Sequence, residues 1–182
     1  LYKIWKKDTK IKFLDLNEFE FTFLAMKLAL YKHPKANEIL EIQKNNISNP
    51  DEKNRFIWLL PSLSQDVNIR DAFMRSLAEA KNREKERWVT AALANIHHPL
   101  RQSESIKHFD LCLELLQEIQ LTGDIFFPKR WLNNSVGLYN SEEAYRKTQD
   151  FIKKHPDYNP ILMKKLLLVI DDLERAQYLI QP

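Results

Sequence analysis

Two adjacent histidines, His97 and His98, come nearest to a metal-binding pattern in this sequence. Neighbouring side chains on a helix point about 100° apart, so they rarely share one ion, and zinc needs several converging ligands. No H-E-x-x-H motif occurs, and the other histidines are scattered: His33, His108 and His155. We therefore predict no metal ligand in this chain and expect His97 and His98 to pack or cap at the helix end before Pro99.

The single cysteine, Cys112, is the other group that could act chemically, as a nucleophilic thiol. Catalytic thiols need partly exposed, electropositive surroundings with a base nearby, whereas Cys112 stands between Leu111 and Leu113. A role in core packing is therefore favoured, and one cysteine excludes an internal disulfide framework. Because spacing alone carries no triad geometry, no Ser-His-Asp or Cys-His arrangement can be assigned. We predict no catalytic residue.

The elements that must position these side chains are helices. Only two glycines, Gly123 and Gly137, occur in 182 residues, and both lie where a helix should end. At Gly123 we expect the left-handed conformation that commonly closes a last turn. Phosphate-binding loops and tight hairpins need glycine. A nucleotide-binding α/β enzyme and a β-sandwich are therefore both disfavoured.

The charge balance requires no polyanionic partner. The 28 basic and 25 acidic residues give a net charge of +3 and are mixed along the chain, so neither nucleic-acid nor membrane affinity is demanded. No apolar run approaches the roughly 20 residues that span a bilayer, and no signal-peptide pattern begins the sequence. We expect no membrane span and no nucleic-acid partner; a cytoplasmic and a periplasmic location both stay open.

Start signals for helices recur along the chain. Asn17 and Glu20 have capping-box spacing. The helix after them should bury one face, comprising Phe19, Phe23, Met26 and Leu30, with Leu24 and Leu28 widening that face. Further expected starts are Pro34, Asn49-Pro50, Asp66, Asn82, Ser103, Pro128, Ser141 and Asn159-Pro160.

The ends of several helices can be predicted as well. Pro61 should stop the helix that begins at Pro50. The helix from Ser103 should run unbroken to Gly123. The last helix should begin at Pro160 and continue along one apolar stripe, comprising Leu162, Leu166, Val169, Leu173, Ala176 and Ile180. The acids Asp171, Asp172 and Glu174 would lie on its solvated face.

These signals predict an all-α fold of about eight or nine helices with short connections. Successive antiparallel pairs favour an irregular α-solenoid of the HEAT or armadillo type, with a compact bundle as the alternative. The sequence begins at Leu1 without an initiator methionine. We therefore expect residues 1–16 to be a connecting segment from a missing upstream domain, and residues 17–182 to form the helical-repeat domain.

A series of short strings suggests a family. In order, they are N-P-D-E-K-N-R-F at 49–56, P-S-L-S at 61–64, R-D-A-F at 70–73, R-W-V at 87–89, H-H-P-L-R at 97–101, E-I-Q-L-T-G-D-I-F-F-P at 118–128, W-L at 131–132, H-P-D-Y at 155–158 and D-D-L-E-R-A at 171–176. Together they resemble the C-terminal helical domain of bacterial aminopeptidase N-like zinc metallopeptidases (the gluzincin peptidase family M-one). The resemblance covers nearly the whole chain.

The resemblance implies that catalysis and the control of substrate access belong to different domains. In that family a separate thermolysin-like domain carries the zinc, through H-E-x-x-H and a downstream glutamate, and neither motif is present here. The implied role of this chain is to close over the active-site cleft and limit which peptides reach the metal. No cofactor is then expected in this segment, with zinc in the missing catalytic domain; the expected partners are that domain and the peptide substrate. The segment alone would not be an enzyme.

The sequence departs from the family pattern in the last helix. Glu174 follows Leu173 where an aromatic residue would be expected, and residues 168–170 are large and apolar where small residues would be expected. Both departures bear on how this helix packs.

Three arginines are the candidate substrate contacts. An arginine fork suits the carboxylate of a peptide. The candidates are Arg70, Arg83 and Arg101, and for each a structural salt bridge is the favoured alternative.

The first competing function is a free-standing α-solenoid that binds another protein. The second is a helical-repeat nucleic-acid binder, which the balanced charges disfavour.

Overall fold

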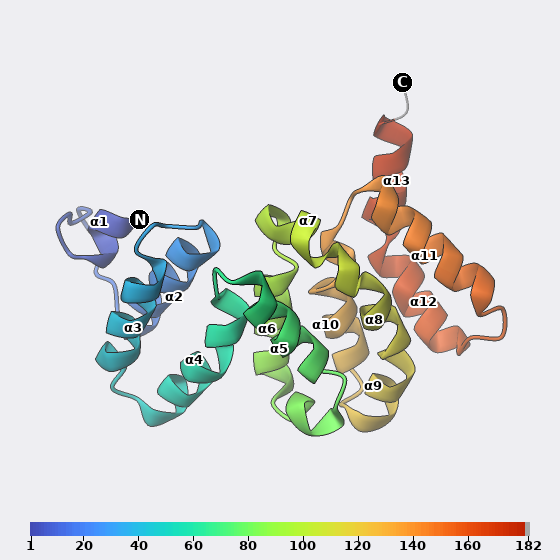
Figure 1. The fold of residues 1–182 in the computed structure, drawn as a ribbon, viewed down its shortest axis with the longest axis horizontal. Helices are drawn as coiled ribbons and strands as arrows, with labels where there is room; N and C mark the ends of the chain where they lie inside the picture. Colours follow the sequence, from blue (N-terminus) through green and yellow to red (C-terminus); the bar gives the residue numbers. More distant parts are fainter. Residues whose placement is uncertain (181–182) are drawn as a thin grey trace. The chain divides into compact units, whose positions relative to one another are not determined.

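A computed structural model describes residues 1–180, and it confirms the all-α prediction. Every regular element in these residues is helical, and no strand occurs among them. Residues 181 and 182, at the end of the predicted domain 17–182, and the side chain of Ile180 lie outside the described residues. The chain divides into two compact units, Leu1–Arg70 and Asp71–Pro182, which we call unit 1 and unit 2 (Figure 1).

Unit 1 is built from four helices. They are α1 (Tyr2–Trp5), α2 (Glu18–Leu30), α3 (Ala36–Asn46) and α4 (Pro50–Leu63). The predicted capping box begins α2, because Asn17 Oδ1 accepts from Glu20 N and Asn17 N donates to Glu20 Oε2. Asn49 caps α4 by accepting from Asp51 N and Glu52 N. Trp5 of α1 lies in a core cluster with Ala25, Leu28 and Ile39, so part of the predicted connecting segment packs on α2 and α3.

The buried face of α2 includes the predicted Leu28 and Leu30 but not the two predicted phenylalanines. Phe19 and Phe23 are 58% and 51% exposed, whereas Ala25, Leu28, Ala29 and Leu30 are buried. This helix is apolar on most sides, so periodicity alone could not select the face that packs. The two small alanines lie on the packed side, where they let neighbouring helices approach closely.

Helix α4 also passes its predicted end. It continues through Pro61 and ends at Leu63, because a proline in the last turn removes only one intrahelical bond. The bond from Ser64 N to Pro61 O closes that turn.

Unit 2 contains the remaining helices, with α5 (Val67–Ser76) crossing the boundary between the units. The other α-helices are α6 (Glu86–Ile96), α7 (Gln102–Ser105), α8 (Phe109–Glu114), α9 (Leu116–Thr122), α10 (Phe127–Asn133), α11 (Glu142–Lys154), α12 (Pro160–Val169) and α13 (Asp171–Ile180). Short 3-10 turns are η1 (Ala80–Arg83), η2 (Pro99–Arg101), η3 (Ile106–His108) and η4 (Val136–Leu138). Asn82 lies inside η1 rather than capping α6, and its side chain donates to Ser76 O.

Two predicted long helices of unit 2 are each divided. The helix expected from Ser103 to Gly123 forms α7, η3, α8 and α9. The helix expected from Pro160 onwards is interrupted at Ile170, and Asp171, Asp172 and Glu174 occupy the first turn of α13. Acidic side chains are favourable at a helix N-terminus, which gives this break a local cause. The predicted stripe is otherwise buried at Leu162, Leu166 and Leu173.

Gly123 is needed for space, not for a left-handed backbone. Its φ is −108°, so the expected left-handed closure is wrong. A Cβ atom there would lie 2.6 Å from Phe127 Cδ1, 3.0 Å from Glu86 Oε1 and 3.0 Å from Ile119 O. The close approach lets Asp124 N donate to Glu86 Oε1 at 2.7 Å.

Gly123→Ala is accordingly expected to lower the free energy of unfolding by about 1 to 3 kcal/mol, the usual cost of overpacking. Gly137→Ala is the matched control: its Cβ would meet Val169 Cγ1 at 2.6 Å, but the nearest main-chain oxygen, Leu132 O, would lie at 3.3 Å instead of 3.0 Å. Val169 is also half-buried, whereas Phe127 is only 1% exposed. Urea unfolding of both variants checks this. An equal or smaller effect at Gly123 would contradict the steric explanation.

Candidate functional site

One of the two predicted helix-end histidines, His97, belongs to a buried polar network in unit 2. His97 is fully buried; its Nδ1 lies 2.7 Å from the Tyr139 hydroxyl, and its Nε2 lies 3.6 Å from Cys112 Sγ. Tyr139 and Ser105 hydroxyls lie 2.9 Å apart, and Ser105 Oγ donates to Arg101 O. His98 instead caps η2 through its Nδ1, which accepts from Leu100 N. A cysteine and a histidine thus come together that sequence spacing could not pair.

The electrostatics of this network oppose nucleophilic chemistry. Burial, with a smaller contribution from the charge of His108, lowers the pKa of His97 from its ordinary 6.5 to about 3. Burial also raises the pKa of Cys112 to about 12 and raises the pKa of Tyr139. At neutral pH the imidazole, thiol and phenol are therefore all uncharged. This arrangement can fix the positions of α6, α7, α8 and η4, but it supplies no thiolate.

Cys112 should therefore resist alkylation in the native protein. At pH 8 we expect iodoacetamide to modify it at least about 100-fold more slowly than in urea, because reaction requires an accessible thiolate. Mass spectrometry of timed samples measures both rates. Comparable rates in the two solvents would contradict the burial and protonation described above.

The three predicted substrate-contacting arginines are all buried. Arg70 is 5%, Arg83 is 3% and Arg101 is 1% exposed. Arg70 Nη1 donates to Ser64 O at 2.6 Å, and Arg101 Nη1 donates to Asn95 O at 3.3 Å. Both bonds hold main-chain carbonyls near helix ends, which is a structural use of the guanidinium. Contact of either arginine with a substrate stays a prediction.

Arg83 joins three segments of unit 2. Its Nη1 donates to Leu77 O at 2.5 Å and to Ala78 O at 2.8 Å, and its Nη2 lies 2.5 Å from Glu118 Oε1. A hollow of about 330 Å³ adjoins it, lined by residues that include Lys81, Glu84 and Gly123. The salt bridge considered as the alternative in the sequence is therefore present at Arg83.

A second cluster, which the sequence did not reveal, joins the buried Asp71 and His108 to the exposed Lys107 in unit 2. Asp71 lies 2.7 Å from His108 Nε2 and 2.5 Å from Lys107 Nζ. Burial raises the pKa of Asp71, but the hydrogen bonds and the charges of Lys107 and His108 together outweigh burial and lower it below its ordinary 3.8. The partners lie 36 and 37 positions apart in the chain, so no local pattern could have indicated them.

A groove of about 670 Å³ lies in unit 1, between α1, the start of α2 and α3. Its apolar wall includes Phe21, Ile39 and Ile42, and its polar lining includes Lys6, Lys7, Glu18, Glu38 and Asn46. Trp5 Nε1 donates to Gln43 Oε1 at 2.9 Å, and Gln43 Nε2 donates to Thr22 Oγ1 at 3.0 Å, which fixes the groove wall. Its size lies within the range of about 300 to 1,000 Å³ for small-ligand pockets.

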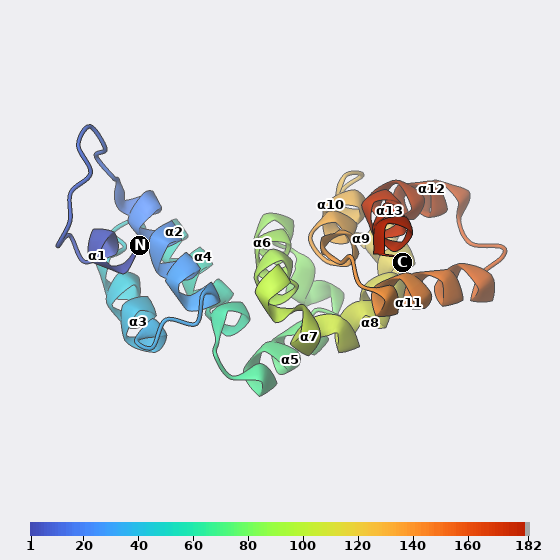
Figure 2. The same ribbon diagram turned by 90° about the horizontal axis from the view of Figure 1, so that it is seen from above.

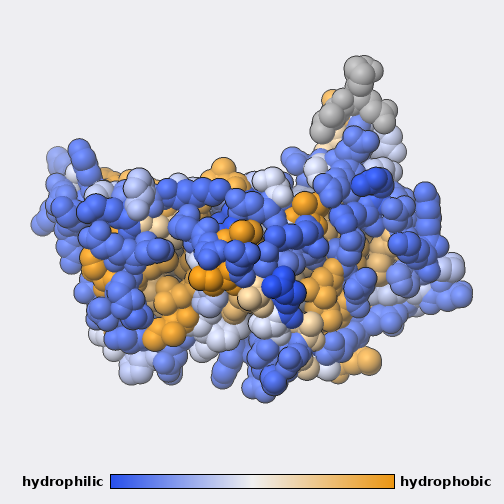
Figure 3. All heavy atoms as spheres, viewed as in Figure 1, coloured by the Kyte–Doolittle hydropathy of each residue, from blue (hydrophilic) through white to orange (hydrophobic). Residues whose placement is uncertain are grey.

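The described residues contain neither a metal-binding group nor a membrane-spanning helix. No group of three or more His, Cys, Asp and Glu side chains placed to hold a metal ion occurs in residues 1–180. Among the same residues, no helix combines the length and apolar character required to cross a bilayer. Figure 3 shows that the visible face is mainly hydrophilic, with separate apolar areas.

In comparisons with known proteins, no protein-family model, no curated protein and no solved structure matches this chain significantly.

Proposed function

We propose that this chain is the non-catalytic C-terminal helical domain of a zinc aminopeptidase that removes N-terminal residues from peptides. It would close over the active-site cleft and limit which peptides enter. The observation that carries the proposal is the ordered set of family-like strings between residues 49 and 176. The all-α fold agrees with the expected architecture.

The positions of the strings support a scaffold role. Asn49 caps α4, His97 and Arg101 are buried at the turn between α6 and α7, and Trp131 Nε1 donates to Cys112 O inside unit 2. Residues shared with the family pattern therefore hold helix ends and helix contacts. A rigid helical wall can exclude water and large substrates from a neighbouring cleft.

Zinc and the catalytic groups would come from another domain of the same protein. The first test is the coding sequence upstream of Leu1, where H-E-x-x-H followed by a glutamate is expected. The second is an assay of the purified 182-residue chain with added zinc on aminoacyl chromogenic substrates, where no hydrolysis is expected. Zinc-dependent activity that persists at high purity would contradict a non-catalytic role.

The gating role is tested in the intact enzyme. Hydrolysis of peptides with two to ten residues would be compared before and after removal of residues 17–182, alongside a chromogenic substrate that reports the zinc site itself. Deletion should relax discrimination between short and long peptides while hydrolysis of the small substrate is retained. Unchanged length selectivity would remove the gating role.

The groove of unit 1 offers a surface for the far end of a peptide. Ile42, in its lining, is 41% exposed, and Ile42→Glu in the intact enzyme should raise KM for long peptides without changing kcat for the small substrate. Ile57→Glu on α4 is the matched control, because Ile57 is 45% exposed and does not line the groove. Equal KM values for both variants would exclude the groove from peptide contact.

A free-standing interaction scaffold is the second candidate. It is favoured by the exposed Phe19 and Phe23 of α2, because aromatic side chains are enriched at protein interfaces. An intact gene without an upstream zinc-protease motif would select this candidate over the aminopeptidase.

A further inference from the structure

The positive charge of the chain is concentrated at its beginning. Residues 1–14 contain five lysines and one aspartate and so carry +4, whereas residues 15–182 together carry −1. The five lysines are all exposed: Lys3, Lys6, Lys7, Lys10 and Lys12. The near-neutral average therefore conceals a local basic surface in unit 1.

This basic stretch leads into an exposed loop. The connection between α1 and α2, residues 6–17, stands away from the helices of unit 1 in Figure 2, where it is dark blue. Leu14 N donates to Ile11 O at 3.1 Å, which closes a turn with Lys12 and Phe13 at its tip. Phe13 has a φ of 65° in a turn position where glycine is the usual residue.

The tip of this turn exposes apolar side chains between lysines. Phe13 is 95% exposed, and Ile11 and Leu14 are each 46% exposed. Lys10 and Lys12 flank Ile11, and Lys12 Nζ lies 4.9 Å from the centre of the Phe13 ring. The turn thus presents an aromatic ring, two aliphatic side chains and two ammonium groups within five residues.

This combination of lysines with apolar side chains fits an anionic bilayer better than a nucleic acid. Lysines near an anionic bilayer surface are attracted by its potential, and adjacent apolar side chains gain by entering the headgroup and acyl boundary. Nucleic acid would also attract the lysines, and Phe13 could stack on a base. Ile11 and Leu14, however, have no aromatic ring that could stack on a base, whereas both can be buried in the hydrocarbon of a bilayer.

We propose that the α1–α2 loop binds the surface of a bilayer rich in anionic phospholipid. Phe13, Ile11 and Leu14 enter the headgroup region, and Lys10 and Lys12 contact lipid phosphate groups. The contact is peripheral and involves no membrane-spanning segment. It goes beyond the proposed peptidase role and does not depend on it.

Sedimentation with vesicles tests the proposal on the 182-residue chain. Binding to vesicles with 30 mol% phosphatidylserine in phosphatidylcholine should exceed binding to pure phosphatidylcholine by at least about tenfold, and it should fall as salt rises from 50 to 300 mM. Equal binding to the two vesicle types would overturn the proposal. Binding of a single-stranded RNA probe without binding to anionic vesicles would also overturn it.

Matched variants distinguish the contribution of the loop to vesicle binding from the contribution of the net charge. Lys10→Glu with Lys12→Glu should weaken vesicle binding by about 25-fold or more, at roughly fivefold per lysine. Lys153→Glu with Lys154→Glu makes the same charge change at exposed positions of α11 and should change binding by less than about twofold. Phe13→Ser should weaken binding about tenfold, whereas Phe126→Ser, at a position 67% exposed in unit 2, should not. Equal losses within either pair would overturn the assignment to the loop.

Insertion can be observed directly. Phe13→Cys creates an accessible thiol, while Cys112 is buried, so a polarity-sensitive fluorophore can be attached at position 13 alone. Its emission should shift to shorter wavelength on addition of anionic vesicles but not of neutral ones. Vesicle binding without such a shift would overturn the entry of Phe13 into the headgroup region.

Discussion

Arg83→Ala is expected to lower the free energy of unfolding of unit 2 by about 3 kcal/mol. The guanidinium donates to Leu77 O and Ala78 O and pairs with Glu118. Its removal leaves buried carbonyls without a donor, at about 1 to 3 kcal/mol each. The Glu118 pair adds less, because that carboxylate is 43% exposed and exposed pairs contribute little.

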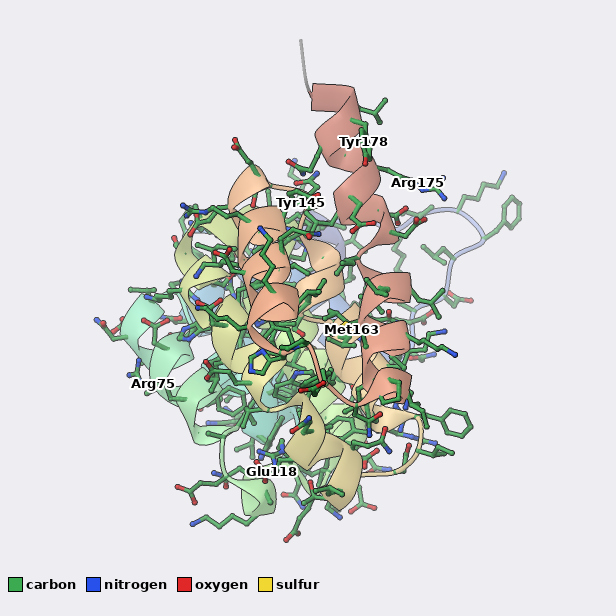
Figure 4. All side chains as sticks on the ribbon, turned by 90° about the vertical axis from the view of Figure 1, so that its right-hand side faces the viewer. Arg75, Glu118, Tyr145, Met163, Arg175 and Tyr178 are labelled. Carbon is green, nitrogen blue, oxygen red and sulfur yellow. The ribbon has the colours of Figure 1, made fainter. Side chains whose placement is uncertain are left out.

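Arg175→Ala is the matched control for this change. Arg175 pairs with Asp171 across one turn of α13, and its side chain is 71% exposed; Figure 4 labels it together with Glu118. We expect an effect below about 0.5 kcal/mol there. Urea unfolding followed by circular dichroism gives both values, and amide exchange of peptides from residues 71–180 localises the change to unit 2.

The same experiment separates two roles for Arg83. A structural role predicts the large loss of stability at Arg83 and the small one at Arg175. A side chain that serves only to contact a peptide would leave the unfolding curve unchanged while weakening peptide binding. Similar unfolding midpoints for Arg83→Ala and the unmodified protein would therefore contradict the structural role and favour the substrate-contact prediction.

Local signals in the sequence predicted local structure well. Asn17, Asn49, Ser141 and Asn159 each accept hydrogen bonds from the first turn of a helix, as their spacing indicated. Capping depends on residues within three or four positions, so the sequence contains all the information needed. The all-α class followed from the same signals and from the scarcity of glycine.

Predictions that depend on distant contacts were less successful. The spacing of Phe19 fits the buried face of α2, but the choice of face depends on α3 and α4. The position of Gly123 after a helix predicts a left-handed backbone, but its constraint comes from Phe127 and Glu86. The pairs His97–Cys112 and Asp71–His108 are brought together only by folding. The basic stretch at residues 3–12 was visible in the sequence, whereas the turn that exposes Phe13 was not.

Unit 2 is expected to lose stability steeply in acid because of His97. Its imidazole is fully buried beside Tyr139 and Cys112, and its pKa falls from an ordinary 6.5 to about 3, chiefly through burial. Between these values the unfolded state binds a proton that the folded state does not. Stability is therefore unaffected above pH 6.5 and declines as the pH falls towards 3, by up to about 1.4 kcal/mol per pH unit.

Urea unfolding between pH 7 and pH 4.5 measures this slope above the range in which Asp71 takes up a proton. His97→Gln removes the titrating group and should flatten the slope by about one proton, even though the variant starts from lower stability because Tyr139 and Cys112 lose a partner. His33→Gln in unit 1, at a half-buried position, is the matched control for replacing a histidine outside the buried network. A pH slope in His97→Gln equal to that of the unmodified protein would show that a different group controls acid unfolding. The sign follows from burial alone: a histidine that the fold keeps neutral makes protonation favour the unfolded chain, whichever function the protein performs.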